Sequence, residues 1–287
     1  MVNETIKLIE CPRDAMQGWP HFIPTEKKIK YINALLKVGF DTIDFGSFVS
    51  PKAIPQMADT KDIINNLQLV NSKSKLLAII ANERGATDAI VFDEITYLGF
   101  PFSVSETFQK RNTNSTIEES LKRVEVIQNL SFINNKELVI YISMGFGNPY
   151  GDIYNEEIVF NWVNKLVAMG IKIISLADTV GLASADQVYR VTKNIVDSLP
   201  AIEIGVHLHS TPNNWREKID AALQAGCKRF DGALKGIGGC PMAGDDLVGN
   251  MDTELMIPYF NELNLLNNLD MDALKQCSQI ATEIFTP

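Results

Sequence analysis

The chain alternates short apolar runs with longer amphipathic stretches, and this alternation restricts its possible folds more than any other feature. Each apolar run is rich in Ile, Val and Phe, and the residues after it repeat with the spacing of one helix face. The candidate strands are 5–11, 42–48, 75–81, 89–95, 137–144, 171–177, 202–208 and 229–234. The candidate helices are 25–38, 59–69, 117–129, 156–169, 184–198, 214–225 and 271–284. Repeated strand–helix units of this kind predict an α/β protein with a parallel sheet.

Two architectures are built from such units, the (β/α)8 TIM barrel and the doubly wound open sheet. The open sheet usually has a GxGxxG turn after its first strand, whereas this chain has Cys-Pro-Arg-Asp at 11–14. The 287 residues contain no linker between halves, and about 250 residues is typical of one barrel. The sequence therefore predicts a single TIM-barrel domain over 1–287, with the barrel at about 5–265 and a short C-terminal helix at about 266–287.

Some of the predicted helices carry end signals. Ser115 and Thr116 precede two glutamates, which is the pattern of a helix N-cap followed by acidic residues. Gly39, Gly170 and Gly226 each stand between a predicted helix and the next strand, where a left-handed residue commonly ends a helix.

Composition excludes several classes of function. Lys and Arg number 26 against 35 Asp and Glu, and the net charge of −9 makes a general nucleic-acid or anionic-membrane binder improbable. No apolar run reaches the ~18–20 residues that span a bilayer. The four cysteines, at 11, 227, 240 and 277, are too scattered for a disulfide framework. We therefore expect a cytoplasmic protein with reduced thiols.

Polar side chains recur at the predicted strand ends, where a TIM barrel places its chemistry. They are Arg13, Asp14 and Gln17 after strand 1, Asp44 and Ser47 on strand 2, Tyr141 and Ser143 on strand 5, Ser175, Asp178 and Thr179 at strand 6, and His207 and His209 at strand 7. This agreement between fold and residue type is stronger evidence for a site than any single motif.

The pair His207 and His209 is the sharpest of these signals. Residues two apart on a strand project to the same face, so the two imidazoles are able to share one cation. The alternative is two histidines with ordinary hydrogen bonds at a strand end. The chain has three histidines in all, and the third, His21, follows a Trp-Pro turn and is expected to be a surface or lid residue.

Asp14 is the best carboxylate to complete a cation site with the two histidines. An Asp–His–His–amide set suits Mg²⁺ or Mn²⁺, with positions left open for substrate oxygens. The alternative for Arg13 and Asp14 is an ion pair or helix cap within the loop. Cys240 follows the glycines of the 236–239 loop, where a thiol can act as an acid or base, while the other three cysteines are expected to pack in the interior.

Six stretches also carry a family resemblance. They are Ile-Glu-Cys-Pro-Arg-Asp-Ala-Met-Gln at 9–17, Ser-Phe-Val-Ser-Pro-Lys at 47–52, Asn-Ser-Thr-Ile-Glu-Glu-Ser at 114–120, Ile-Ser-Leu-Ala-Asp-Thr-Val-Gly at 174–181, Val-His-Leu-His at 206–209 and Gly-Ile-Gly-Gly-Cys-Pro at 236–241. Together with Gly249 and Asn250 they resemble the 3-hydroxy-3-methylglutaryl-CoA lyase family of metal-dependent TIM-barrel lyases. The resemblance runs from about 6 to 254.

The resemblance implies a set of roles. A divalent cation, Mg²⁺ or Mn²⁺, would be held by Asp14, His207, His209 and Asn250, with Asp245 or Asp246 as competitors for the last place. The implied catalytic residues are Arg13, Asp44, Asp178, His207 and Cys240, and the implied substrate contacts are Gln17, Ser47, Tyr141, Ser175 and Thr179. The implied partners are an acyl-CoA substrate and a second copy of the chain in a homodimer, with no nucleic acid and no membrane.

The implied reaction is cleavage of 3-hydroxy-3-methylglutaryl-CoA (HMG-CoA) to acetyl-CoA and acetoacetate, as in leucine degradation and ketone-body formation. Three departures surround the acid end of the substrate: Asp44 replaces the usual Glu, Val139 replaces an Arg, and 210–213 lack the common Asp-Thr-Tyr-Gly. The alternatives are a related lyase or aldolase for another 3-hydroxyacyl-CoA or a 2-oxo acid, a synthase of the same group, and a non-catalytic binding barrel.

Overall fold

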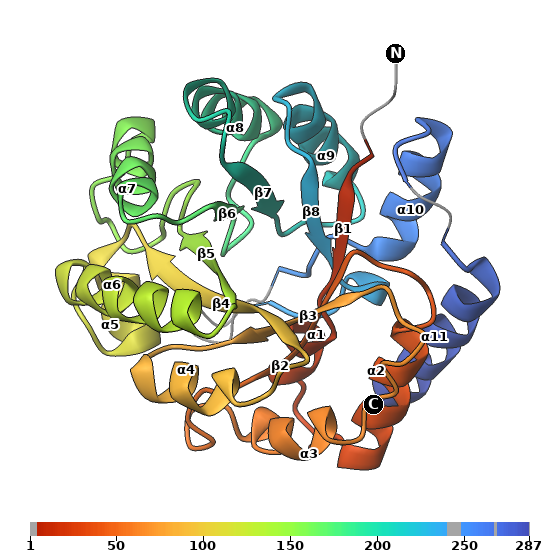
Figure 1. Ribbon diagram of the computed structural model, residues 1–287. Coiled ribbons are helices and arrows are strands. Elements are labelled where there is room, and N and C mark those ends of the chain that lie inside the picture. Colours follow the sequence, from red (N-terminus) through yellow and green to blue (C-terminus); the bar gives the residue numbers. More distant parts are fainter. Residues whose placement is uncertain (1–4, 240–247, 267–268, 287) are drawn as a thin grey trace.

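A computed structural model describes residues 5–239, 248–266 and 269–286. Eight parallel strands close into a barrel in the order β1 to β8, with β8 paired to β1 (Figure 1). The strands are β1 Lys7–Glu10, β2 Thr42–Ser47, β3 Lys75–Ile79, β4 Ile95–Ser103, β5 Glu137–Ser143, β6 Ile173–Ala177, β7 Glu203–His207 and β8 Arg229–Gly232. The predicted TIM barrel is confirmed.

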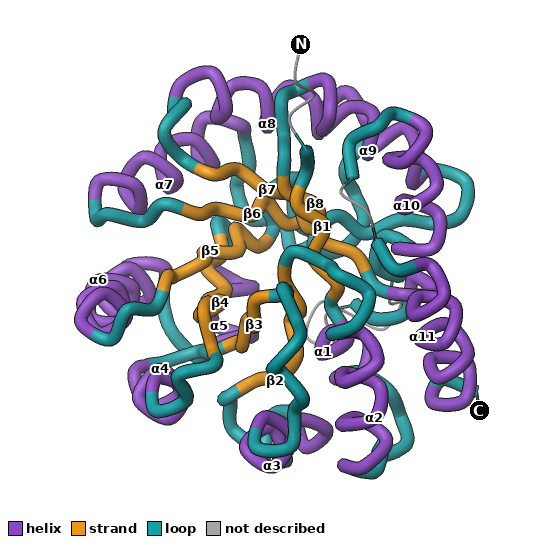
Figure 2. The backbone as a smooth tube through the Cα atoms, turned by 45° about the vertical axis from the view of Figure 1, so that its right-hand side comes forward, coloured by secondary structure: helices purple, strands orange, loops and turns teal. Residues whose placement is uncertain are grey.

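The helices form a ring around the strands (Figure 2). They are α1 Pro12–Gln17, α2 Thr25–Leu35, η1 Pro55–Met57, α3 Thr60–Ile64, α4 Glu83–Ile90, α5 Glu106–Thr113, α6 Ile117–Ile133, α7 Glu156–Ala168, α8 Ala185–Ser198, α9 Trp215–Gln224, η2 Leu234–Gly236, α10 Thr253–Glu262 and α11 Met271–Ile284. Among the described residues, no helix is both long and apolar enough to cross a bilayer.

The predicted fourth strand was wrong. Residues 89–95 contain the end of α4, and the strand itself runs over Ile95–Ser103. The apolar run at 89–92 spans the last two residues of α4 and the turn after it, and its periodicity alone did not distinguish a helix end from a strand. Gly99 and Pro101 weaken the strand signal. Pro101 is tolerated because the pairing of β4 with β3 ends at Gly99, while its pairing with β5 continues to Ser103.

The predicted end signals are confirmed. The Thr116 hydroxyl accepts from the Glu119 N–H, and the Glu119 side chain accepts from the Thr116 N–H, which is a complete capping box at α6. Gly39, Gly170 and Gly226 have φ values of 92°, 89° and 91°. Gly170 and Gly226 directly follow the C-cap residues of α7 and α9, and Gly39 closes the turn after α2; at each position the left-handed backbone avoids the steric cost that a side chain would add.

The C-terminal helix α11 packs on the outside of the barrel beside α2 (Figures 1 and 2). Phe285, just beyond α11, meets Trp19 edge-on at a ring-centroid distance of 5.3 Å and Tyr31 at 6.3 Å. The predicted outer helix is therefore present, and it covers the first βα unit, which carries Arg13 and Asp14.

Candidate active site

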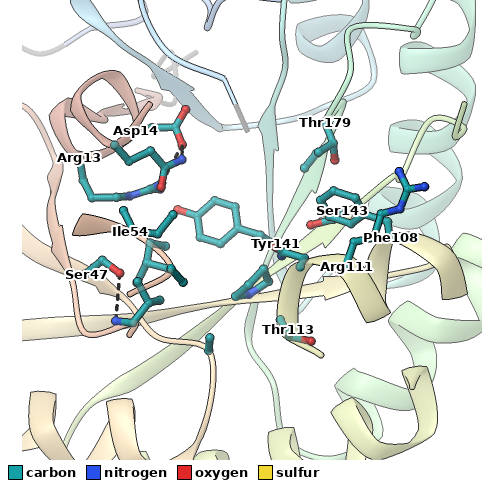
Figure 3. Close-up of a pocket in the computed structure, with 18 of the residues that line it drawn as sticks. Arg13, Asp14, Ser47, Ile54, Phe108, Arg111, Thr113, Tyr141, Ser143 and Thr179 are labelled. Atoms are coloured by element: carbon teal, nitrogen blue, oxygen red, sulfur yellow. Dashed lines mark hydrogen bonds and ion pairs between the residues drawn. The ribbon is translucent and has the colours of Figure 1, made fainter. Parts of the chain in front are cut away.

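A cavity of about 430 Å³ opens at the carboxyl ends of the strands. Residues at the ends of β2 to β7 and on α1 and α5 line it, as expected for a TIM-barrel site. Nine of the polar residues that the sequence placed at strand ends line this cavity: Arg13, Asp14, Gln17, Ser47, Tyr141, Ser143, Thr179, His207 and His209. Figure 3 shows Arg13, Asp14 and Ser47 on one side, with Ser143, Thr179 and Arg111 on the other.

Arg13 is held in a buried network with two carboxylates. Its Nε and Nη2 donate to Asp44 Oδ2 at 3.0 and 2.5 Å, and its Nη1 donates to Asp14 Oδ1 at 2.7 Å. Burial acts to lower the pKa of Arg13, but the charges of Asp44 and Asp14 outweigh it and raise the pKa above the usual range. The guanidinium is therefore a fixed positive charge at the wall of the cavity. Asp44 does not line the cavity, so it contacts Arg13 on the side of the guanidinium away from the cavity.

The cavity also brings together the three predicted ligands Asp14, His207 and His209. One potential ligand atom from each lies within 4.8 Å of the others. Burial acts to raise the pKa of Asp14, but the nearby Arg13 and the two histidines outweigh burial. The net pKa is below the ordinary value, so the carboxylate stays ionised. For His209, burial is the main cause of a pKa lowered to about 4, with the charge of His207 adding to it. A neutral imidazole beside a carboxylate is the state that binds a cation.

His207 is oriented by Asp231, a residue that the sequence analysis did not single out. His207 Nδ1 lies 3.1 Å from Asp231 Oδ2, and both groups are buried. Burial acts to lower the pKa of His207, but the hydrogen bond and charge of Asp231, followed by the charge of Asp14, raise it above the ordinary value. Because Nδ1 faces Asp231, Nε2 is the nitrogen that remains for a cation, as in carboxylate–histidine–metal arrangements.

Asn250 joins the same cluster from a distant part of the chain. Its Nδ2 donates to Asp14 Oδ2 at 2.7 Å and to the Ile237 carbonyl at 2.9 Å. It also forms an antiparallel bridge with His209. The Asn250 side chain is thus fixed beside Asp14 with its amide nitrogen toward the carboxylate, and its role as a ligand stays a prediction. The competing residues Asp245 and Asp246, and Cys240, lie outside the described residues.

Asp178 and Ser175, like Asp44, are predicted site residues that do not line the cavity. The Asp178 carboxylate accepts from Lys218 Nζ at 2.7 Å in a buried ion pair, and Lys218 also donates to the His209 carbonyl at 2.8 Å. Ser175 is completely buried one layer beneath the cavity, beside Tyr141 in the strand register. Both therefore contact the site through other residues in this structure.

Tyr141 forms part of the cavity floor. Its ring meets His207 edge-on at a centroid distance of 5.7 Å. Figure 3 shows the ring in the middle of the cavity, with its hydroxyl end turned toward the side of Arg13. The hydroxyl has no hydrogen-bond partner among the described residues. Buried polar groups are nearly always paired, so this hydroxyl is available to a substrate or a water.

The wall opposite Arg13 is made of residues that were not predicted as site residues. It comes from α5 and the turn after it, and the residues that line the cavity are Phe108, Arg111, Asn112, Thr113 and Asn114. Tyr150 stacks on Phe108 at a centroid distance of 6.4 Å, and Arg111 lies over the Tyr150 ring. Asp152 accepts from the Thr107 N–H at the start of α5. The Ser105 N-cap, followed by Glu106, was the local sequence signal for α5, whereas its contact with Asp152 from the loop after β5 could not be read from the sequence.

Comparison with known proteins identifies the family of this chain. The HMGL-like family model matches residues 6–281. The hydroxymethylglutaryl-CoA lyase YngG of Bacillus subtilis is 32% identical over 266 residues, covering 92% of this chain and 87% of that protein. The (R)-citramalyl-CoA lyase of Chloroflexus aurantiacus is 31% identical over 283 residues, covering 94% and 88%.

Solved structures give the same result. An HMG-CoA lyase from Acinetobacter baumannii, in complex with coenzyme A and 3-methylmalate, matches with a TM-score of 0.90 and 31% identity, covering 99% of this chain and 92% of that one. The fold and site define a TIM-barrel enzyme of the carbon–carbon lyase class. This chain belongs to the HMGL-like family.

Proposed function

We propose that this protein is a divalent-cation-dependent lyase that cleaves HMG-CoA to acetyl-CoA and acetoacetate. The observation that carries the proposal is the meeting of Asp14, His207 and His209 beside the fixed charge of Arg13. The relatives named for HMG-CoA lyase activity support the substrate, and the structure solved with coenzyme A supports an acyl-CoA ligand. The match to the family model supports the reaction class.

The donor set fits Mg²⁺ or Mn²⁺. It contains a carboxylate, two imidazoles and an amide, and no thiolate, which is the combination that favours these ions over a structural zinc. Asp14, His207, His209 and Asn250 would hold the cation. When bound, it would supply a Lewis acid for the hydroxyl and carboxylate oxygens of the substrate.

Arg13 is the residue that stabilises the enolate of the leaving acetyl-CoA. Its guanidinium is held on one side by Asp44 and on another by Asp14, so it needs little reorganisation as negative charge develops on the thioester oxygen. Preorganised charge of this kind stabilises the transition state more than the ground state, which is what lowers a barrier.

The enolate carbon must then receive a proton. The sequence offers His207 and Cys240 for this step. His207 already uses Nδ1 toward Asp231, and Nε2 is its candidate ligand atom, so it has no free nitrogen when it binds a cation. We therefore assign the proton transfer to the Cys240 thiol in the segment between Ile237 and Asn250.

Citramalyl-CoA is the second candidate substrate. The relative named for that activity is 31% identical, close to the 32% of the B. subtilis HMG-CoA lyase. The barrel interior also favours a substrate whose acid end differs from that of HMG-CoA. Val139, which replaces an Arg of the family, supplies no positive charge there and packs in an apolar cluster with Leu77, Tyr97, Tyr141 and Ile173.

Product analysis separates the two candidates. Cleavage of HMG-CoA releases acetoacetate, and cleavage of citramalyl-CoA releases pyruvate, with acetyl-CoA formed in both. We expect the purified protein with Mn²⁺ to give acetoacetate at a kcat/KM at least about 10-fold above that for pyruvate formation, a difference of ~1.4 kcal/mol. Pyruvate as the main product would transfer the assignment to citramalyl-CoA, and no turnover of either would reject the lyase.

Replacing Asp231 by asparagine tests the orientation of His207. Loss of the carboxylate removes the group that fixes the tautomer, and outer-shell partners of this kind typically contribute 10–100-fold to metal affinity or activity. We expect the Kd for Mn²⁺, measured by calorimetry, to rise by about that factor. Asp197→Asn, which alters an exposed carboxylate paired with Lys193, is the matched control and should bind Mn²⁺ as the unmodified protein does.

A further inference from the structure

Glu10, the last residue of β1, is a buried acid without a basic partner among the described residues. It is completely buried on the outer side of β1, and no described Lys, Arg or His forms an ion pair with it. Isolated buried carboxylates are costly and are rarely kept without a reason. Its partners are instead two neutral donors: the Leu234 N–H donates to Oε1 at 2.8 Å, and the Thr253 hydroxyl donates to Oε2 at 2.6 Å.

These two donors flank one segment of the chain. Leu234 begins η2 directly after β8, and Thr253 begins α10 where the chain returns to the barrel. Between them lies Asn250, whose side chain bonds Asp14 at 2.7 Å. Glu10 is itself four residues before Asp14. One carboxylate therefore contacts both ends of the segment that brings Asn250 to the candidate cation site.

The backbone around Glu10 explains how the two ends come together. The Ala233 N–H donates to the Met251 carbonyl at 2.9 Å, and the Thr253 N–H donates to the Ala233 carbonyl at 3.2 Å. Gly232 pairs with Glu10 in the strand register. A Cβ at Gly232 would lie 2.9 Å from both the Met251 carbonyl oxygen and the Thr253 hydroxyl, so the glycine is what lets the returning segment lie on the strands.

We propose that Glu10 is a positioning residue for the cation site: by holding Leu234 and Thr253 together, it keeps residues 249–253 in place and Asn250 against Asp14. The inference rests on the proposed function, because the cation site is part of that proposal. Glu10 contacts no ligand of the site directly, and it acts through the backbone that it fixes.

Mn²⁺ affinity, measured by calorimetry without any acyl-CoA, tests this role. Glu10→Leu removes both acceptors and leaves the Leu234 N–H unpaired, so we expect its Kd for Mn²⁺ to rise about 10-fold or more. Glu10→Gln keeps the size and one acceptor oxygen, and Thr253→Val removes one donor, so both should show a smaller rise. Glu262→Gln makes the same Glu-to-Gln replacement at the exposed end of α10, the helix that Thr253 begins, and should leave the Kd unchanged.

The pattern of results decides between positioning and simple stabilisation. If the Glu10 and Thr253 variants are less stable but bind Mn²⁺ with unchanged Kd, the positioning role is overturned. If Glu10→Leu does not fold, Glu10→Gln and Thr253→Val decide by the same criterion. If the Kd shifts as expected while HMG-CoA and citramalyl-CoA are both inert, the proposed function fails and the role of Glu10 at a cation site stands.

The pH dependence of stability provides a second readout. Burial raises the pKa of Glu10 from 4.5 to about 8, against the effect of its two hydrogen bonds. The ionisable groups around it add no opposing charge: Asp252 and Glu254 lie at the start of α10, Tyr31 on α2 and Cys277 on α11. Because the folded state holds this proton more tightly than the unfolded state, stability from Glu10 is lost as pH rises from about 4.5 to about 8.

Glu10→Gln cannot lose this proton. The Tm of the Glu10→Gln variant minus that of the unmodified protein is therefore expected to increase between pH 5 and pH 8, and to level off above that range. Parallel Tm curves across this range would show that Glu10 ionises without cost. That result would contradict the buried, doubly bonded carboxylate on which the positioning role depends.

Discussion

Replacing Asp14 by asparagine is expected to abolish detectable Mn²⁺ binding and to lower kcat/KM for HMG-CoA by about 10³-fold or more. The carboxylate is the one formal negative charge among the four candidate ligands, and charge stabilisation by a bound cation contributes several kcal/mol at a transition state. Asp14 also receives hydrogen bonds from Arg13, Gln17 and Asn250, so it organises the residues around the cation as well as binding it.

The control for Asp14→Asn is Asp88→Asn. It removes an exposed carboxylate on α4 that is paired with Lys61 of α3. It should leave both Mn²⁺ binding and kcat/KM within about 2-fold, because exposed ion pairs contribute little. Circular dichroism and Tm establish that the Asp14 variant is folded. A folded Asp14→Asn protein that binds Mn²⁺ with the affinity of the unmodified protein would show that the cation site is elsewhere.

Replacing Arg13 by lysine is expected to lower kcat by about 10²–10³-fold with a smaller change in KM. Removing one preorganised donor to a developing oxyanion has an effect of this size. Lysine retains the charge, but its compact ammonium does not reproduce the planar, forked geometry in which Arg13 holds Asp44 and Asp14. We choose lysine over methionine because methionine would leave two buried carboxylates without a cation, which destabilises a protein strongly.

The kcat–KM split is the informative readout for Arg13. A group that acts on the enolate affects kcat, whereas a group that only binds the substrate carboxylate raises KM. Arg111, at the opposite wall, supplies the comparison: Arg111→Lys should change KM for the acyl-CoA more than kcat. An Arg13→Lys variant with unchanged kcat and raised KM would assign Arg13 to substrate binding.

The barrel and the ligand set were predictable because their signals are local. His207 ends β7 and His209 is two residues further along, and Arg13 and Asp14 are adjacent just after β1, so their positions in the sequence alone place them at strand ends. The predictions agree with the structure for the barrel and for the meeting of Asp14 with both histidines. The roles of these residues, the nature of the cation and the homodimer stay predictions.

Other features depend on contacts that no local pattern encodes. Asp231 lies on β8 and meets His207 on β7, and Lys218 reaches Asp178 from α9. The α5 wall is placed by the loop after β5. Asp178 was expected to face the substrate because it follows a strand, yet its carboxylate is turned toward a buried lysine. The fourth strand was misplaced because a helix end and a buried strand are both apolar.

The most direct test of the account is acetoacetate formation from HMG-CoA by protein treated with EDTA, before and after Mn²⁺ or Mg²⁺ is added back. We predict that activity falls to background with EDTA, returns when either cation is restored in excess, and does not return in the Asp14→Asn variant. Undiminished acetoacetate formation in metal-free protein would contradict a cation-dependent lyase. So would the absence of acetoacetate when both cations have been supplied.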